Sequence, residues 1–261
     1  MDARIEQVEE EGHANRSDSR TQGRASASTC FFELDTDLPL SRRVVAELLG
    51  TCLLMSVVSA SSIACSRLFA ADSGSAAVVG AIAISAALLG LIFTFGAISG
   101  GHFNPLITML QWAAGERHAR CVPWYVGAQI TGALCGAWLT RLIYVAEPVA
   151  PRGLLNSSSS LLLSEMVATA GLMIVVCGCA RSGRRDTGPM AVASWLLASI
   201  IVTPSGSYAN PAVSIGAMVS TGSVGLSSAM SAAYVLVEVM GAIVAFGLIS
   251  VTHPMRNSSG A

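Results

Sequence analysis

Six long apolar runs follow one another along this chain, and they constrain its fold more than any other feature. They cover residues 43–64, 76–98, 122–145, 161–180, 190–203 and 229–251. A helix of about 20 apolar residues crosses the roughly 30 Å hydrocarbon core of a bilayer. Within lipid, only helices and closed barrels satisfy all their backbone hydrogen bonds. The runs therefore predict an all-α membrane protein with six transmembrane helices, surrounded by the lipid bilayer.

The composition of the chain argues against several classes of function. Charged residues make up 12% of the 261 residues, about half the share found in soluble domains. A net charge of −1 provides no basic surface for nucleic acid. Most of the seven cysteines lie in or beside apolar runs, without the ligand spacing of a metal site. We therefore expect no metal and no nucleic-acid partner; we also identify no constellation of catalytic residues and no need for a cofactor.

Two shorter apolar segments, 104–113 and 210–219, begin with Asn104-Pro105 and Asn210-Pro211. Asparagine is a preferred N-cap and proline suits the first helical position, so both segments should begin helices there. About ten helical residues reach roughly 15 Å, half of the membrane. Backbone that breaks at this depth must be buried in protein or line a water-filled cavity. Both segments are candidate re-entrant half-helices, although either one alone is also compatible with a surface loop.

The distribution of arginines orients the chain in the membrane. One side of the six-helix arrangement receives Arg42, Arg43, Arg117, Arg120, Arg181, Arg184, Arg185 and Arg256, and the other receives Arg67, Arg141 and Arg152. Because basic residues are enriched in cytoplasmic loops, both termini should be cytoplasmic. The polar segment 1–41 has no apolar period and is predicted to be a disordered cytoplasmic tail. Residues 252–261 form a short C-terminal tail.

The segment between the tails, 42–251, contains an internal repeat with halves at about 42–145 and 161–251. Residues 46–51 are similar to 164–169, 104–106 to 210–212, and 129–133 to 238–242, in the same order. Each half has three spans, an odd number, so the second half must be inverted relative to the first. Inverted repeats with broken helices place the solute site near the middle of the membrane.

With these motifs the chain resembles the major intrinsic protein family, the aquaporins and aquaglyceroporins. Residues 98–105 and Asn210-Pro211-Ala212 are similar to the two family signatures, with Leu106 in place of the usual alanine in the first. The resemblance implies an aquaporin-like hourglass fold with six transmembrane helices and two re-entrant half-helices. It also implies a passive channel for small uncharged solutes such as water and glycerol-like polyols. The expected setting is a homotetramer in a plasma membrane, such as a bacterial inner membrane.

In such a channel, Asn104 and Asn210 would each offer amide donors to a passing solute. The two opposed half-helix N-termini, each carrying about half a positive charge, would repel cations and protons. Glu47 and Glu165 are similar to the membrane glutamates of the family. We expect them to accept hydrogen bonds from backbone donors of the re-entrant loops, with a proton relay as the alternative role.

The predicted selectivity filter departs from that of water-selective relatives, because Val213 stands where they have arginine. Counting along the family pattern without gaps, the other three positions fall at Ile84, Ala198 and Ser207. This ring has no charged donor and only one hydroxyl, which predicts a wider and drier constriction. Bacterial relatives with valine at this position include channels associated with arsenite passage. Metalloid hydroxides are therefore further candidate solutes.

Two other functions are compatible with the sequence. An ion-coupled secondary transporter would need an ion site, and the spans offer only Glu47, Glu165 and Glu238 as acids. A non-conducting structural membrane protein would result if Leu106, Ile84 and Val213 formed a hydrophobic plug.

Overall fold

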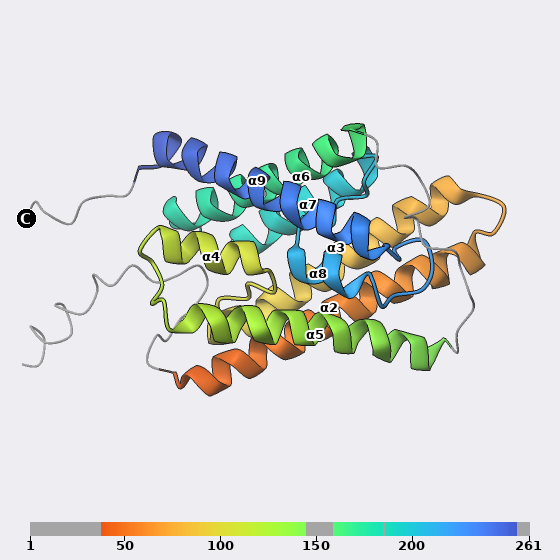
Figure 1. The fold of residues 1–261 in the computed structure, drawn as a ribbon, viewed down its shortest axis with the longest axis horizontal. Coiled ribbons are helices and arrows are strands. Elements are labelled where there is room, and N and C mark those ends of the chain that lie inside the picture. Colours follow the sequence, from red (N-terminus) through yellow and green to blue (C-terminus); the bar gives the residue numbers. More distant parts are fainter. Residues whose placement is uncertain (1–37, 145–158, 185, 255–261) are drawn as a thin grey trace, which may run out of the picture. The chain divides into compact units, whose positions relative to one another are not determined.

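The computed structural model describes residues 38–144, 159–184 and 186–254, all within one compact unit. The predicted tails, 1–41 and 252–261, lie almost entirely outside the described residues. The described part of the chain is helical (Figure 1). Its long helices are α2 (Leu40–Leu68), α3 (Ser73–Ser99), α5 (Cys121–Ile143), α6 (Ser159–Arg181), α7 (Gly188–Val202) and α9 (Ser228–Thr252), and its short helices are α4 (Pro105–Ala113) and α8 (Pro211–Gly216).

Four of the described helices, α2, α3, α6 and α9, are long and apolar enough to cross a membrane by length and composition alone. Helix α7 is apolar but has 15 residues, about 22 Å of helix. Helix α5 has 23 residues and contains the buried polar side chains of Gln129 and Thr140. Thr140 donates a 3.1 Å hydrogen bond to the Ser56 carbonyl on α2, so this polarity faces protein.

The helices pack as two similar halves, as an inverted repeat predicts. Helix α2 packs against α3 and α5, and α6 packs in the same way against α7 and α9. Between the halves, α3 contacts α7, and each short helix contacts both α5 and α9. Figure 1 shows α4 and α8 lying between the long helices.

Glycines at matching positions of the two halves allow close helix packing. A Cβ atom at Gly132 on α5 would collide with the Leu48 carbonyl oxygen on α2, and one at Gly241 on α9 with the Met166 carbonyl oxygen on α6. In membranes, where association depends on packing, small residues let backbones approach closely. This approach brings the polar side chains of α5 and α9 next to the half-helices.

Both half-helices begin where the Asn-Pro pairs predict. The Asn104 side-chain oxygen accepts a 3.0 Å hydrogen bond from the Leu106 N–H, and the Asn210 side-chain oxygen accepts one of the same length from the Ala212 N–H. Helix α8 ends at Gly216, earlier than the predicted residue 219. The N–H of Met218 bonds three residues back, to Ile215, and such tighter turns commonly close a helix.

Candidate functional site

The two N-cap asparagines join the half-helices to each other. The Asn104 amide donates a 2.8 Å hydrogen bond to the Ala209 carbonyl, and the Asn210 amide donates one of 2.8 Å to the Phe103 carbonyl. A side-chain amide has two N–H donors, and each of these bonds uses one. Asn104 and Asn210 both line a cavity, and the second N–H donor of each is not used by these bonds.

The residues before the two asparagines adopt an unusual backbone conformation. Phe103 and Ala209 both have a φ of 47°, in the left-handed region that non-glycine residues rarely occupy. Such residues cost about 1–3 kcal/mol each and persist only where surrounding contacts hold them. Here the conformation turns each carbonyl toward the asparagine of the opposite half, so it forms part of the site.

Glu47 and Glu165 hold the loops that contain these two residues. Glu47 is fully buried and accepts hydrogen bonds from the backbone N–H groups of His102 at 3.0 Å and Phe103 at 2.7 Å. Glu165, also fully buried, accepts them from Tyr208 at 3.3 Å and Ala209 at 2.5 Å. Burying a carboxylate is costly unless its oxygens are hydrogen-bonded, and these donors offset that cost.

Gln129 and Glu238 also contact the groups of this site, and the sequence patterns alone did not assign them a role there. Gln129 donates from its side-chain amide to Glu47 at 2.8 Å and to the Thr108 hydroxyl at 3.0 Å. Glu238 accepts from the Asn210 N–H at 3.1 Å. The similarity of 129–133 to 238–242 in the repeat was the signal that could have identified them.

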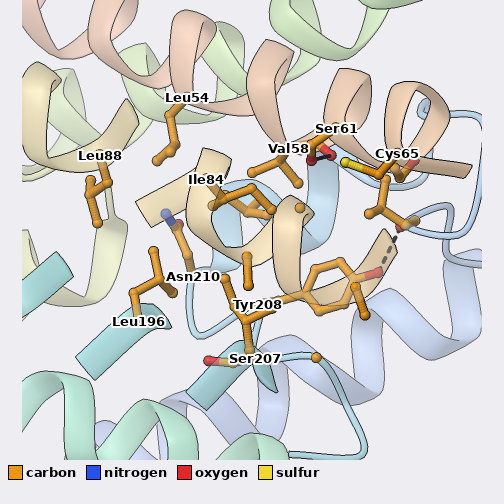
Figure 2. Close-up of a pocket in the computed structure, with 18 of the residues that line it drawn as sticks. Leu54, Val58, Ser61, Cys65, Ile84, Leu88, Leu196, Ser207, Tyr208 and Asn210 are labelled. Carbon is orange, nitrogen blue, oxygen red and sulfur yellow. Dashed lines mark hydrogen bonds between the residues drawn. The ribbon is translucent and has the colours of Figure 1, made fainter. Parts of the chain in front are cut away.

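A cavity of about 430 Å³ passes both asparagines, and Figure 2 shows some of the side chains that line it. Its wall is mainly aliphatic. From α2, α3 and the two loops, the lining includes Leu54, Val58, Ile84, Leu88, Ile92, Phe103, Ser207 and Tyr208; from α6, α7 and α8 it includes Leu172, Val176, Val192, Leu196, Ile200 and Val213. Such a wall offers few hydrogen-bonding groups along most of its length.

Three of the four residues predicted for the constriction, Ile84, Ser207 and Val213, line this cavity. Ala198 does not: it lies on the exposed face of α7. Two residues along a helix correspond to a rotation of about 200°, so Ala198 points away from the face that carries Leu196 and Ile200. Counting along the family pattern did not take into account which face of the helix each residue occupies. Ile200, and not Ala198, lines the cavity.

Leu106 is buried in the hydrophobic core and is not part of the cavity lining. The plug considered above would need this side chain in the cavity. The same core holds Ala212 of the second motif, while Pro105 and Pro211 are the first residues of their helices.

Three serines of α2 that line the cavity beside Cys65 share one feature. Ser61, Ser62 and Ser66 donate to backbone carbonyls of their own helix, at 3.0, 3.1 and 2.6 Å. A hydroxyl has one hydrogen and two lone pairs. These three side chains therefore present acceptors to the cavity, whereas the two asparagines present donors.

Comparison with known proteins relates the chain to membrane channels. The model of the family described as "Major intrinsic protein" matches residues 35–204. The aquaglyceroporin AqpS of Rhizobium meliloti (strain 1021) is 33% identical over 213 residues, covering 82% of this chain and 91% of that protein. Nodulin-26 of Glycine max is 32% identical over 188 residues, covering 69% and 67%.

A solved structure supports the same fold. The aquaglyceroporin from Plasmodium falciparum matches with a TM-score of 0.65 at 16% sequence identity, over 82% of this chain and 97% of that chain. At this identity the similarity concerns the fold alone. The six long helices and two half-helices form an aquaporin-like hourglass.

Proposed function

Since the chain belongs to the major intrinsic protein family, whose members are passive membrane channels and not enzymes, we propose that it conducts small uncharged solutes past Asn104 and Asn210. The observation that carries this proposal is the reciprocal hydrogen bonding of the two asparagines beside an aliphatic cavity. Their amide donors replace part of the hydration of a solute oxygen, while the opposite wall accommodates its apolar side.

The preferred solutes are larger than water and carry O–H groups. Ile84, Ile200 and Val213 give the constriction no hydrogen-bonding side chain, and Ser207 gives it one hydroxyl, which accepts a 2.9 Å hydrogen bond from Ser199. Glycerol-like polyols and the neutral hydroxides of metalloids such as arsenite fit this pattern. They donate to the serine acceptors and accept from the asparagines.

Ions and protons are excluded in this proposal. The positive N-terminal ends of α4 and α8 both point toward the middle of the pathway, where they oppose a cation. The aliphatic wall offers an ion no groups to replace its water. Breaking the orientation of a water chain at the asparagines also opposes proton transfer.

The protein is a multi-pass membrane protein. We propose a homotetramer in a plasma membrane, such as a bacterial inner membrane, with both termini cytoplasmic, a channel domain over 42–251 and polar tails on either side. The arginine distribution supports the orientation. Large apolar side chains such as Leu49, Trp138 and Ile143 are 44–63% exposed on α2 and α5, which suits contact with lipid or a neighbouring subunit.

Stopped-flow light scattering on proteoliposomes, with water, glycerol and arsenite in parallel, tests the proposal. The expected result is flux of all three above that of protein-free liposomes, proportional to the solute gradient. Flux that requires a proton or sodium gradient would instead indicate a secondary transporter. Flux no greater than that of protein-free liposomes would indicate a non-conducting structural protein.

A further inference from the structure

Glu238 is a fully buried acid whose two oxygens have different surroundings. Its Oε1 accepts hydrogen bonds from the Asn210 N–H at 3.1 Å and from the Ser214 hydroxyl at 2.7 Å. Its Oε2 is buried and has no hydrogen-bond partner among the described residues. An unsatisfied buried oxygen on a group that touches a pore asparagine requires an explanation.

A second buried carboxyl, Glu165 on α6, lies close to Glu238, because the two side chains accept hydrogen bonds from consecutive backbone N–H groups, those of Ala209 and Asn210. Helices α4 and α8, which also pack against α9, contain no titratable side chain. The other titratable residues of α6 are Cys177, Cys179 and Arg181, at least three turns further along the helix. Tyr234 lies one turn before Glu238 on α9, and its ring contacts that of Tyr208; neither phenol can supply a positive charge. Two carboxylates would therefore lie close together in the protein interior without a described cation between them.

The matching position in the first half avoids this conflict. There Gln129 donates its amide hydrogen to Glu47, so a neutral side chain stabilises the carboxylate. Glu238 can donate in the same way only if it carries a proton. Glu165, with two backbone N–H donors, is the better place for the negative charge of the pair.

We propose that Glu238 carries a proton on Oε2, directed toward the Glu165 carboxylate, and that this proton holds Asn210 in its pore position. Glu238 is thus a positioning residue: it acts on the solute through the Asn210 backbone. When the proton leaves to water, two buried carboxylates repel each other. Because both hold the segment 208–210 by its N–H groups, this repulsion displaces Asn210.

The first test compares the pH dependence of glycerol flux, and it rests on the proposed channel function. Buried glutamates are known to titrate as high as about pH 8–9, so fluxes are compared from about pH 6 to about pH 9.5. The wild type should lose most of its flux reversibly at the alkaline end, and the flux of Glu238→Gln should not depend on pH. The matched variant Gln129→Glu places a second acid beside Glu47 in the first half. It should therefore lose more of its glycerol flux at alkaline pH than the wild type does. A wild type without alkaline loss, or a Glu238→Gln variant with the same loss, would overturn the proposal.

The second test does not depend on transport. Infrared spectra of the protein in lipid at neutral pH should contain a carboxylic-acid C=O band that disappears in Glu238→Gln and remains in Glu47→Gln. A band that persists in Glu238→Gln would overturn the proposal even if no variant conducts. If the band behaves as expected but no variant conducts at any pH, the proposed channel function fails and the proton assignment stands.

Discussion

The side-chain amide of Asn104 donates a 2.8 Å hydrogen bond to the backbone carbonyl of Ala209, 105 positions further along the chain. Asn210 makes the matching bond to Phe103. Each asparagine also caps its own half-helix, so one side chain serves three purposes. It begins a helix, joins the two halves of the repeat and, in the proposed channel, offers its remaining donor to a solute.

Replacing Asn104 with alanine should weaken both the fold and the transport. Loss of an N-cap costs about 0.5–2 kcal/mol, and the bond to Ala209 is lost in addition. The thermal transition of the solubilised protein and its glycerol flux should both decrease. Met109→Ala is the control, because Met109 lies on the same half-helix and is 42% exposed. Equal stability and equal flux in the two variants would contradict the assigned role of Asn104.

Glu47 and Glu165 should tolerate glutamine better than alanine. Alanine strands the backbone donors of the re-entrant loop, and each stranded donor costs about 1–3 kcal/mol. Glutamine keeps one acceptor oxygen and should therefore show a smaller loss. Thermal unfolding of the four single variants checks this order. If both alanine variants unfold at the wild-type temperature, these glutamates do not hold the loops.

The close contact between α5 and α2 predicts that Gly132→Ala is destabilising. The added methyl group would meet the Leu48 carbonyl oxygen, and overpacking of a fitted interface costs about 1–3 kcal/mol. Gly127→Ala is the matched control on the same helix, because a Cβ there meets no atom within 4 Å. We expect a lower unfolding temperature for Gly132→Ala and an unchanged unfolding temperature for Gly127→Ala. The reverse order would show that α5 does not pack closely against α2 at Gly132.

The sequence predicted those parts of the site that depend on local signals. The pairs Asn104-Pro105 and Asn210-Pro211 locate the starts of α4 and α8, because capping preferences act within one helical turn. The left-handed conformation of Phe103 and Ala209 was not predictable, since neither residue type favours it and it depends on contacts with the other half of the chain.

One error and one omission in the predicted site have identifiable physical causes. Ala198 was placed in the constriction by counting along an ungapped pattern, whereas the spacing of Leu196 and Ile200, one helical turn apart, would have indicated the correct face of α7. Glu238 was considered only as a possible ion site, although it occupies the position of Gln129 in the repeat. Its contact with Asn210 depends on the packing of α9 against α8.

In the proposed channel, neutral solutes pass a dry constriction that includes Val213. This constriction can be tested by the ratio of glycerol flux to water flux in proteoliposomes containing the wild type or Val213→Arg. Arginine adds five donors, a fixed positive charge and a long side chain, so it should obstruct glycerol more than water. Val213→Ile, which adds volume without donors, controls for size alone. We expect a clear fall in the ratio for Val213→Arg and a smaller change for Val213→Ile. A rise in the ratio for Val213→Arg would show that Val213 does not line a dry constriction.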